Sequence, residues 1–369
     1  MKIMVAAGGT AGHLFPALSL IQNLKNLDKT NRFFLVLNSY SYKKNLLIPG
    51  YVDLLFIDSR SVSRSLSLHN LISVVKLFKG FVQSFIMVIK HKPDIVVGFG
   101  GYASFAICLF SVMNKIPTLI HEQNVVCGKA NLLLSRIVDK VLVSFPETLE
   151  YFKKRKINAI LVGNPTRPDL KRIESVSAKK QFGFEADKFV ILVAGGSQGS
   201  RRINQVFPEA LKLIPKEIKS RFSVIHLSGK SDFDSICAAY NNLGIDYKVY
   251  DFFEDMSSAY SASDLVISRS GAMTVTEICF FGKASILIPY PFAYGHQVQN
   301  AEYLSVKGAS VLVEEKFLNA SLLKDKILDI YKDENVLSRM RKIAENSFPL
   351  DAGSKLAQEL DCLYKKTLR

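Results

Sequence analysis

Short apolar runs of strand length alternate with longer amphipathic segments along most of this chain. The first series reads KIMVAAG, RFFLVLN, DLLFID, DIVVGFG, TLIHEQ and KVLVSF. The second series reads KFVILVAGG, RFSVIHLSG, YKVYDFF, DLVISRSG and ASILIPYP. Nearly continuous apolar strands separated by helical stretches are typical of βαβ units, in which helices cover both faces of a parallel sheet. The sequence therefore predicts an α/β protein with two parallel sheets.

The two series open alike, with VAAGGTAG at 5–12 and VAGGSQGS at 193–200, as if one unit were used twice. A polar segment with two prolines, at about 163–180, separates them and is interpreted as a linker. The length of 369 residues suits two domains of ordinary size. We expect Rossmann-like domains over 1–165 and 166–346, with their sheets facing across a cleft. A C-terminal helix within 347–369 is expected to return to the first domain.

Charge and cysteine content narrow the class of protein. The net charge of +15 indicates an anionic partner, unless lysine is simply the habitual surface residue. No recognition helix, zinc finger or aromatic RNA-binding signature is present, so nucleic acid is not the expected partner. Five scattered cysteines without a CxxC pair indicate neither a disulfide framework nor a zinc site. No apolar stretch is long enough to span a bilayer, and the N-terminal run is interpreted as a cytoplasmic first strand.

Glycine pairs follow the first strand of each series, in GGTAGH and GGSQGS. Glycines allow a tight turn and close approach of a ligand, and the helix that follows offers free N–H groups to a phosphate. Neither loop matches the GxGxxG or P-loop pattern. His13 stands where a helix should begin, with Pro16 expected in the first turn. A neutral histidine there could be a general base, and the alternative is a capping or packing residue.

Three further segments carry polar side chains near expected strand or helix ends. In SRSGAMTVTEI, Glu277 is expected in the first turn of a helix, where it complements the helix dipole or binds a vicinal diol. In HEQN, residues 121–124, four polar side chains in succession are expected to face a ligand, and the pattern is not a zinc motif. The DxD segment at 232–234 is interpreted as a helix cap rather than a metal site.

Seven segments resemble, in order and over most of the chain, the MurG family of bacterial peptidoglycan glycosyltransferases. They are GGTAGH, FGGYASF, HEQNVVCGKAN, GNPTR, GGSQGS, SRSGAMTVTE and HQVQNAEYL. The resemblance implies a GT-B type inverting enzyme that transfers GlcNAc from UDP-GlcNAc to the C4 hydroxyl of undecaprenyl-diphosphate-MurNAc-pentapeptide, lipid I, giving lipid II. It implies that the enzyme acts at the cytoplasmic face of the inner membrane and takes part in cell-wall synthesis, cell shape and cell division. It also implies an N-terminal acceptor domain, a C-terminal donor domain, and no cofactor or metal.

The resemblance carries over residue by residue. In the N-terminal half and the second glycine loop, the family's substrate-binding positions fall on Thr10, Ala11, Gly12, Asn124, Arg167 and Ser197. In the rest of the C-terminal half they fall on Phe253, Ala272, Met273, Thr274, Val275, Thr276, Glu277 and Gln297. The chain departs from the family pattern at Ala11, where a glycine is common, at Phe253, which is often aliphatic, and at Tyr294-Gly295, where an acidic residue is often present.

The implied mechanism divides these residues by task. Thr274 and its neighbours, Ser197 with the loop amides, and Arg167 would hold the UDP diphosphate. Glu277 would bind the ribose and Gln297 the GlcNAc. His13 would take the proton from the acceptor hydroxyl.

Leu71 to Lys92 is an apolar segment with interspersed lysines, which is expected to lie on anionic lipid or to be an ordinary helix packed on the sheet. Two alternative functions stay open at this point. One is another UDP-sugar enzyme of the same fold, a UDP-GlcNAc 2-epimerase or a glycolipid synthase. The other is a non-catalytic basic protein that binds nucleotides or polyanions.

Overall fold

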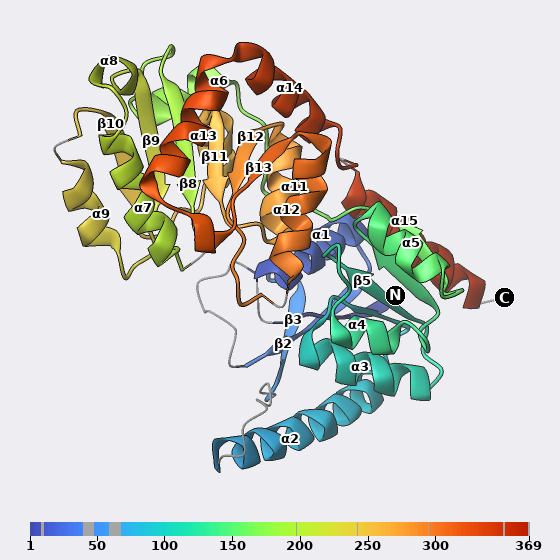
Figure 1. Ribbon diagram of the computed structural model, residues 1–369. Helices are drawn as coiled ribbons and strands as arrows, with labels where there is room; N and C mark the ends of the chain where they lie inside the picture. The colour runs from blue at the N-terminus through green and yellow to red at the C-terminus, as the bar shows by residue number, and fades with distance from the viewer. Residues whose placement is uncertain are drawn as a thin grey trace. The chain divides into compact units, whose positions relative to one another are not determined.

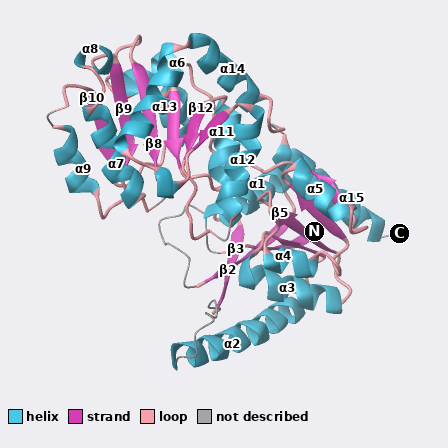
Figure 2. Cartoon of the chain, in the orientation of Figure 1, coloured by secondary structure: helices cyan, strands magenta, loops and turns pink. Residues whose placement is uncertain are grey.

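The computed structural model describes residues 1–8, 11–39, 48–58, 68–196, 198–241, 243–293, 295–349 and 351–367, without the side chains of residues 11 and 68–76. The chain separates into two compact units (Figure 1). Unit 1 contains Met1–Pro168 and Pro349–Arg369, and unit 2 contains Asp169–Phe348. Each unit contains one sheet with helices on its faces (Figure 2).

Unit 1 is built on a seven-stranded sheet in the order β3-β2-β1-β4-β5-β6-β7. Every neighbouring pair is parallel. The strands are β1 (Lys2–Ala6), β2 (Arg32–Asn38), β3 (Val52–Ile57), β4 (Ile95–Gly98), β5 (Thr118–Glu122), β6 (Lys140–Val143) and β7 (Ala159–Leu161). The edge strand β7 is only three residues long and was not predicted, because its run AIL is too short to show a pattern.

The helices of unit 1 cover both faces of this sheet. They are α1 (Ala11–Leu27), α2 (Leu68–His91), α3 (Gly101–Met113), α4 (Lys129–Leu134), α5 (Pro146–Lys153) and α15 (Ala352–Thr367). Alternate residues of β1 point to opposite faces, so that Ile3 and Val5 pack with α1 and α15. Met4 packs on the other face with residues of α2, α3, α4 and α5. The C-terminal helix α15 therefore completes the core of unit 1, through Leu356 and Leu360.

Unit 2 repeats this plan with a six-stranded parallel sheet in the order β10-β9-β8-β11-β12-β13. Its strands are β8 (Phe189–Ala194), β9 (Phe222–Leu227), β10 (Asp246–Tyr250), β11 (Leu265–Ser268), β12 (Ala284–Leu287) and β13 (Ser310–Leu312). Its helices are α6 (Ser175–Gln181), α7 (Arg201–Lys212), α8 (Lys216–Lys219), α9 (Phe233–Tyr240), α10 (Met256–Ala262), α11 (Ala272–Phe281), α12 (His296–Lys307), α13 (Ala320–Lys332) and α14 (Glu334–Glu345), with a 3-10 turn at Glu315–Phe317. The prediction of an α/β chain with two parallel sheets is confirmed.

Each sheet has one place where the order of strands reverses. In unit 1 the chain moves outward from β1 to β3 and then returns to add β4 on the other side of β1. In unit 2 the same reversal lies between β8 and β11. The connections that leave such a pair run to opposite sides, which opens a crevice beyond the carboxyl ends of the two strands, where ligands bind in folds of this type. The topology therefore assigns one candidate crevice to each unit.

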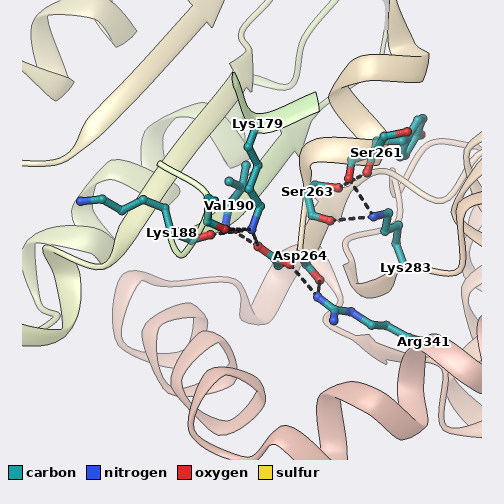
Figure 3. Close-up of polar contacts among 10 residues, drawn as sticks. Lys179, Lys188, Val190, Ser261, Ser263, Asp264, Lys283 and Arg341 are labelled. Atoms are coloured by element: carbon teal, nitrogen blue, oxygen red, sulfur yellow. Dashed lines mark hydrogen bonds and ion pairs between the residues drawn. The ribbon is translucent and has the colours of Figure 1, made fainter. Parts of the chain in front are cut away.

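At the amino ends of the unit 2 strands lies a cluster of buried and partly buried charges (Figure 3). Asp264, just before β11, accepts a hydrogen bond from the Val190 amide at 2.9 Å and forms ion pairs with Lys179 and Arg341 at 3.0 and 2.8 Å. Lys283, just before β12, donates to the carbonyls of Ser261 and Ser263. Burial, aided by the neighbouring Arg341 and Lys179, lowers the pKa of Lys283 to about 8. The ammonium form of Lys283 is therefore disfavoured in the folded chain.

This cluster predicts how stability depends on pH. The unfolded chain keeps Lys283 protonated up to its ordinary pKa near 10.5, whereas the folded chain releases the proton around pH 8. Between these values the unfolded state binds more protons, so the free energy of unfolding rises with pH, by at most about 1.4 kcal/mol per pH unit from this group. Lys283→Met is expected to remove that rise. Urea unfolding of both proteins at pH 7.5 and pH 9.5 measures it.

Lys212→Met is the matched control, because the Lys212 side chain is half exposed and pairs only with Glu209 on the surface of the same unit. It should leave the pH dependence of the unfolding free energy as in the parent chain. If the free energy of unfolding changed equally with pH in Lys283→Met and in the parent chain, Lys283 would not be the cause of the pH dependence.

Candidate active site

His13 lies at the strand-order reversal of unit 1, as the third residue of α1. Its ring lies against two glycines, one at the end of each central strand. A Cβ placed on Gly8 would lie 2.6 Å from Nδ1 of His13, and one on Gly100 would lie 3.2 Å from Nε2. Both strands are thus followed by glycine because the imidazole occupies the space of a side chain. This position also places the ring beside the positive end of the α1 dipole.

The start of α1 differs from the prediction. Pro16 does not open the helix but is its sixth residue, and the helix begins at Ala11. Proline fits the helical φ and costs only the hydrogen bond that residue 16 would donate to the carbonyl of Gly12. Of the predicted loop residues, Ala11 and Gly12 form the start of α1, and Thr10 lies outside the described residues.

A second helix begins at the same crevice. Gly100 and Gly101 have φ values of 92° and 84°, a conformation that favours glycine, and α3 starts at Gly101 without a side-chain cap. The first-turn N–H groups of α1 and α3 therefore both face the crevice beyond β1 and β4, which suits an anionic group. The glycine pairs in GGTAGH and GGSQGS do not indicate this helix start, although the FGGYASF run contains it.

The HEQN segment at the end of β5 was wrongly expected to face a ligand with all four side chains. His121, Glu122 and Gln123 are buried and bonded within unit 1. Gln123 donates to Nδ1 of His121 at 3.0 Å, so Nε2 carries the proton and donates to the Gly163 carbonyl at 2.9 Å. Burial lowers the pKa of His121 to about 4. The His121 ring is therefore neutral and has a structural role. Its hydrogen bond holds the carbonyl of Gly163, the first residue of the GNPTR segment.

The carboxylate of Glu122 is likewise engaged in hydrogen bonds within unit 1. It accepts hydrogen bonds from the Gly128 amide at 3.0 Å, from Asn131 at 2.9 Å and from the backbone and side-chain amides of Asn124. Asn124 is partly exposed at the end of this network. Arg167, from GNPTR, belongs to unit 1, where its guanidinium lies 4.9 Å from the ring centre of Phe15.

In unit 2 the loop after β8 is locked to the loop after β9. Any Cβ on Gly199 would overlap the Ser228 carbonyl, and one on Gly229 would overlap the Gln198 carbonyl, so the two backbones are in direct contact. Gly199 and Gly229 have φ values of 75° and 77°. Ser197 of this loop lies outside the described residues. The α7 helix begins just after the loop, with Ser200 as its cap.

A buried network holds these two loops together. Asn204 of α7 donates to the Ser228 carbonyl and to Asp232, each at 2.8 Å, so its Oδ1 must accept from Nε2 of His226 at 3.0 Å. The other ring nitrogen of His226 then accepts from the hydroxyl of Tyr240 at 2.8 Å. Burial lowers the pKa of His226 to about 3. In the sequence, only a single histidine inside an apolar strand run points to this network.

The DxD segment was predicted to be a helix cap, but no side chain of the segment makes a capping hydrogen bond. Asp232 stands at the N-cap position of α9 but makes no side-chain capping bond, because its carboxylate accepts from Asn204 instead. Among the described residues, no group of three or more His, Cys, Asp and Glu side chains is arranged to hold a metal ion.

The α11 helix starts at the crevice of unit 2, at Ala272, after Gly271. The side chains of Ala272, Met273 and Val275 are buried, Thr276 donates back to the Ala272 carbonyl at 2.8 Å, and Thr274 is partly exposed. Glu277 is the sixth residue of α11 and not, as predicted, in its first turn. Complementing the helix dipole therefore no longer explains this carboxylate. Glu277 is 8% exposed and accepts a hydrogen bond from the Tyr260 hydroxyl at 3.0 Å.

Gln297 and Phe253 lie at two other carboxyl-end loops of the unit 2 sheet. The Oε1 atom of Gln297 accepts from the backbone amides of Ser270 and Tyr290 at 3.3 and 2.9 Å, which turns its NH2 group away from that contact. Phe253 follows β10, and its ring packs on Tyr250 and Phe182, with ring centres 4.5 and 5.7 Å apart. Phe253 can therefore offer backbone rather than ring surface to a ligand.

Comparison with known proteins places the chain in a family. Residues 3–143 match the glycosyltransferase family 28 N-terminal domain and residues 190–356 its C-terminal domain. A protein of Thermodesulfovibrio yellowstonii is 37% identical over 99% of this chain and 100% of its own length. It is named UDP-N-acetylglucosamine–N-acetylmuramyl-(pentapeptide) pyrophosphoryl-undecaprenol N-acetylglucosamine transferase. A Geobacter sulfurreducens protein with the same name is 34% identical over 99% of this chain and 100% of its own.

The chain belongs to the MurG family of glycosyltransferases. The crystal structure of Acinetobacter baumannii MurG superposes with a TM-score of 0.76 at 26% identity, covering 98% of this chain and 99% of that one. A calicheamicin glycosyltransferase, at 14% identity and a TM-score of 0.70, shares the fold over 100% of this chain and 99% of its own. The predictions of a MurG relationship and of the GT-B fold are therefore confirmed.

The contact between His13 and Gly8 predicts a specific rescue. Gly8→Ala is expected to lower the free energy of unfolding by about 1–3 kcal/mol, because the new methyl group meets the imidazole. In a His13→Ala background the same substitution should cost less, because only the 3.2 Å contact of the new methyl group with the Gly100 carbonyl oxygen remains. Urea unfolding of the two single variants and the double variant measures the difference.

Gly50→Ala is the control, since a Cβ there meets nothing within 4 Å. An equal loss from Gly8→Ala with and without His13 would show that the ring does not occupy this space.

Proposed function

We propose that this chain transfers GlcNAc from UDP-GlcNAc to the C4 hydroxyl of undecaprenyl-diphosphate-MurNAc-pentapeptide, lipid I, with inversion at the anomeric carbon. The product is lipid II. The observation that carries this proposal is the full-length relationship to proteins named for GlcNAc transfer to the N-acetylmuramyl-(pentapeptide) pyrophosphoryl-undecaprenol acceptor. The described residues at the two crevices support a division of tasks between the units.

Unit 2 would hold the donor. The N-terminus of α11, with Thr274 partly exposed in its first turn, offers N–H groups to the UDP diphosphate. The glycine loop before α7, with Ser197, would contribute backbone amides. The sequence resemblance adds a positive charge from Arg167, a residue of unit 1. As the anomeric bond breaks, these groups stabilise the charge that develops on UDP, so no divalent cation is part of the proposed mechanism.

The nucleoside and the sugar would meet separate residues. Glu277 would accept hydrogen bonds from the two ribose hydroxyls, a role consistent with a buried carboxylate that the helix dipole does not explain. The backbone at Phe253 would meet the uracil. Gln297 would donate from its NH2 group to the GlcNAc hydroxyls, because its oxygen is already used by two backbone amides.

Unit 1 would bind the acceptor and carry the base. His13 would take the proton from the C4 hydroxyl while that oxygen bonds to the anomeric carbon and the bond from the anomeric carbon to UDP breaks. The neutral state expected for an imidazole in the first turn of α1 suits this step. The N-termini of α1 and α3 would bind the diphosphate of the acceptor.

We further propose that the enzyme works at the cytoplasmic face of the membrane through α2. No helix among the described residues is long and apolar enough to cross a bilayer. One side of α2 packs on α3 through Phe81, which contacts Phe105 and Phe110. Another side leaves a stripe between 42% and 71% exposed, formed by Phe78, Val82, Phe85, Ile86 and Ile89, with Phe85 at its edge, where its ring also meets Phe110 of α3 with ring centres 5.4 Å apart. This α2 stripe, with Lys90 and Lys92 exposed near its end, suits an anionic lipid surface.

His13→Ala tests the proposed base. It is expected to lower turnover by about 10²- to 10⁴-fold while the affinity for UDP changes little, because the base acts only on the acceptor proton. The measurement is transfer of labelled GlcNAc to a lipid I analogue in the presence of EDTA, beside UDP binding by calorimetry.

His91→Ala, a histidine of the same unit packed on Phe34, is the control. Turnover that barely falls in His13→Ala would rule out His13 as the base, and loss of activity with EDTA would contradict the metal-free mechanism. A reaction without acceptor that yields UDP-ManNAc would indicate an epimerase instead.

The α2 stripe gives a second test. Phe78→Ser with Ile86→Ser is expected to reduce flotation with phosphatidylglycerol vesicles at least tenfold, since burial of each phenylalanine or isoleucine side chain contributes about 1.5–3 kcal/mol. Val306→Ser, which removes a residue 87% exposed in unit 2, should not change flotation. Equal flotation of the stripe variant and the parent chain, or indifference to lipid charge, would contradict this membrane surface.

A further inference from the structure

We infer that Tyr260 is a positioning residue for the carboxylate of Glu277, and that it thereby sets the preference of the donor site for a ribonucleotide over a 2′-deoxyribonucleotide. The inference rests on the proposed contact between Glu277 and the ribose. Tyr260 itself would not touch the nucleotide.

Two contacts fix the Tyr260 side chain. Its hydroxyl donates to Oε2 of Glu277 at 3.0 Å, and the residue is 1% exposed. Its ring stacks on Phe281 of α11, with ring centres 5.1 Å apart and an interplanar angle of 14°. Phe281 is one helical turn beyond Glu277 on the same helix. The phenol therefore packs on α11 and holds the carboxylate of that same helix by one oxygen.

The helix that carries Tyr260 is itself fixed at its start. Asp255 caps α10 by accepting from the Ser258 amide at 3.1 Å. Ser261, the residue after Tyr260, accepts from the Ile173 amide at 3.0 Å. Because α10 begins only three residues after Phe253, one short rigid segment joins the proposed uracil contact to the residue that orients the ribose contact.

A buried carboxylate needs such a partner. At 8% exposure Glu277 has lost most of its hydration, and a hydrogen bond to a charged group offsets part of that loss. The bond also selects one rotamer and one plane for the carboxylate. A ribose with both hydroxyls needs that plane in place to donate to the carboxylate twice. A 2′-deoxyribose has only its 3′ hydroxyl to donate, so its binding depends less on the orientation of the carboxylate plane.

Tyr260→Phe isolates the hydroxyl, because the ring stays stacked on Phe281. We expect the affinity for UDP to fall roughly tenfold, the scale of one hydrogen bond to a charged group, and the affinity for 2′-deoxy-UDP to fall less than about twofold. The preference for UDP then falls at least about fivefold. In turnover, KM for UDP-GlcNAc should rise while kcat stays within about twofold. Calorimetry with both nucleotides and steady-state kinetics measure these values.

Tyr303→Phe is the matched control. It removes another buried tyrosine hydroxyl of unit 2, one that donates to the Ser347 carbonyl at 2.7 Å. It should cost similar thermal stability and leave the preference for UDP intact. An equal loss of preference in this variant would mean that Tyr260 acts only through general stability, which would overturn the inference.

Glu277→Gln separates this inference from the proposed function. If Glu277→Gln leaves the preference for UDP intact, the ribose contact itself is wrong. If Glu277→Gln removes the preference and Tyr260→Phe does not, the ribose contact stands and the positioning role of Tyr260 is overturned. In the double variant, Tyr260→Phe should have no further effect on the preference. An additive effect would also overturn the role, whatever the stability of each single variant.

Discussion

In both units, glycine backbone lies beyond the carboxyl ends of strands, at places where a side chain would collide with its surroundings. In unit 1, Gly8 and Gly100 leave room for the imidazole of His13, and in unit 2, Gly199 and Gly229 let two loops touch through their backbones. Helices begin beside these glycines, and their first-turn N–H groups face the space so created. The phosphate contacts proposed for both units depend on these helix starts, and at Gly8, Gly199 and Gly229 an added methyl group would collide with the His13 ring or with backbone.

Buried histidines play a different part from His13. His121 in unit 1 and His226 in unit 2 are fully buried, each with its tautomer fixed by a glutamine or asparagine amide, and burial lowers the pKa of each well below neutrality. Both hold a carboxyl-end loop in place by neutral hydrogen bonds. His13 instead is partly exposed at a helix N-terminus. Burial thus distinguishes the two structural histidines from His13, although all three residues lie near the end of a strand or the start of a helix.

Sequence patterns predicted what depends on local periodicity and composition. Apolar runs located the central strands and the two-sheet architecture, while β7 and β13 were too short to leave a pattern. Among the site residues, glycine pairs located the crevices, but the structure moved Glu277 out of the first turn and turned most of HEQN inward. Those differences arise from contacts distant in sequence, such as His121 with Gly163 and Tyr260 with Glu277, which no local pattern records.

The two ends of α11 connect the stability of unit 2 with its proposed chemistry. The helix begins at the crevice with Gly271 and ends at Gly282 in the left-handed conformation, where Arg172 donates to the Phe280 carbonyl at 2.7 Å. Lys283 follows directly and belongs to the charge cluster at the amino ends of the strands. The C-terminal end of α11 is therefore held by Arg172 and by the hydrogen bonds of Lys283, and its N-terminus lies at the crevice. The partly buried positive charge of this cluster lies at the C-terminal end of α11, whereas the proposed diphosphate site lies at its N-terminus, so we expect its desolvation cost to affect folding rather than binding.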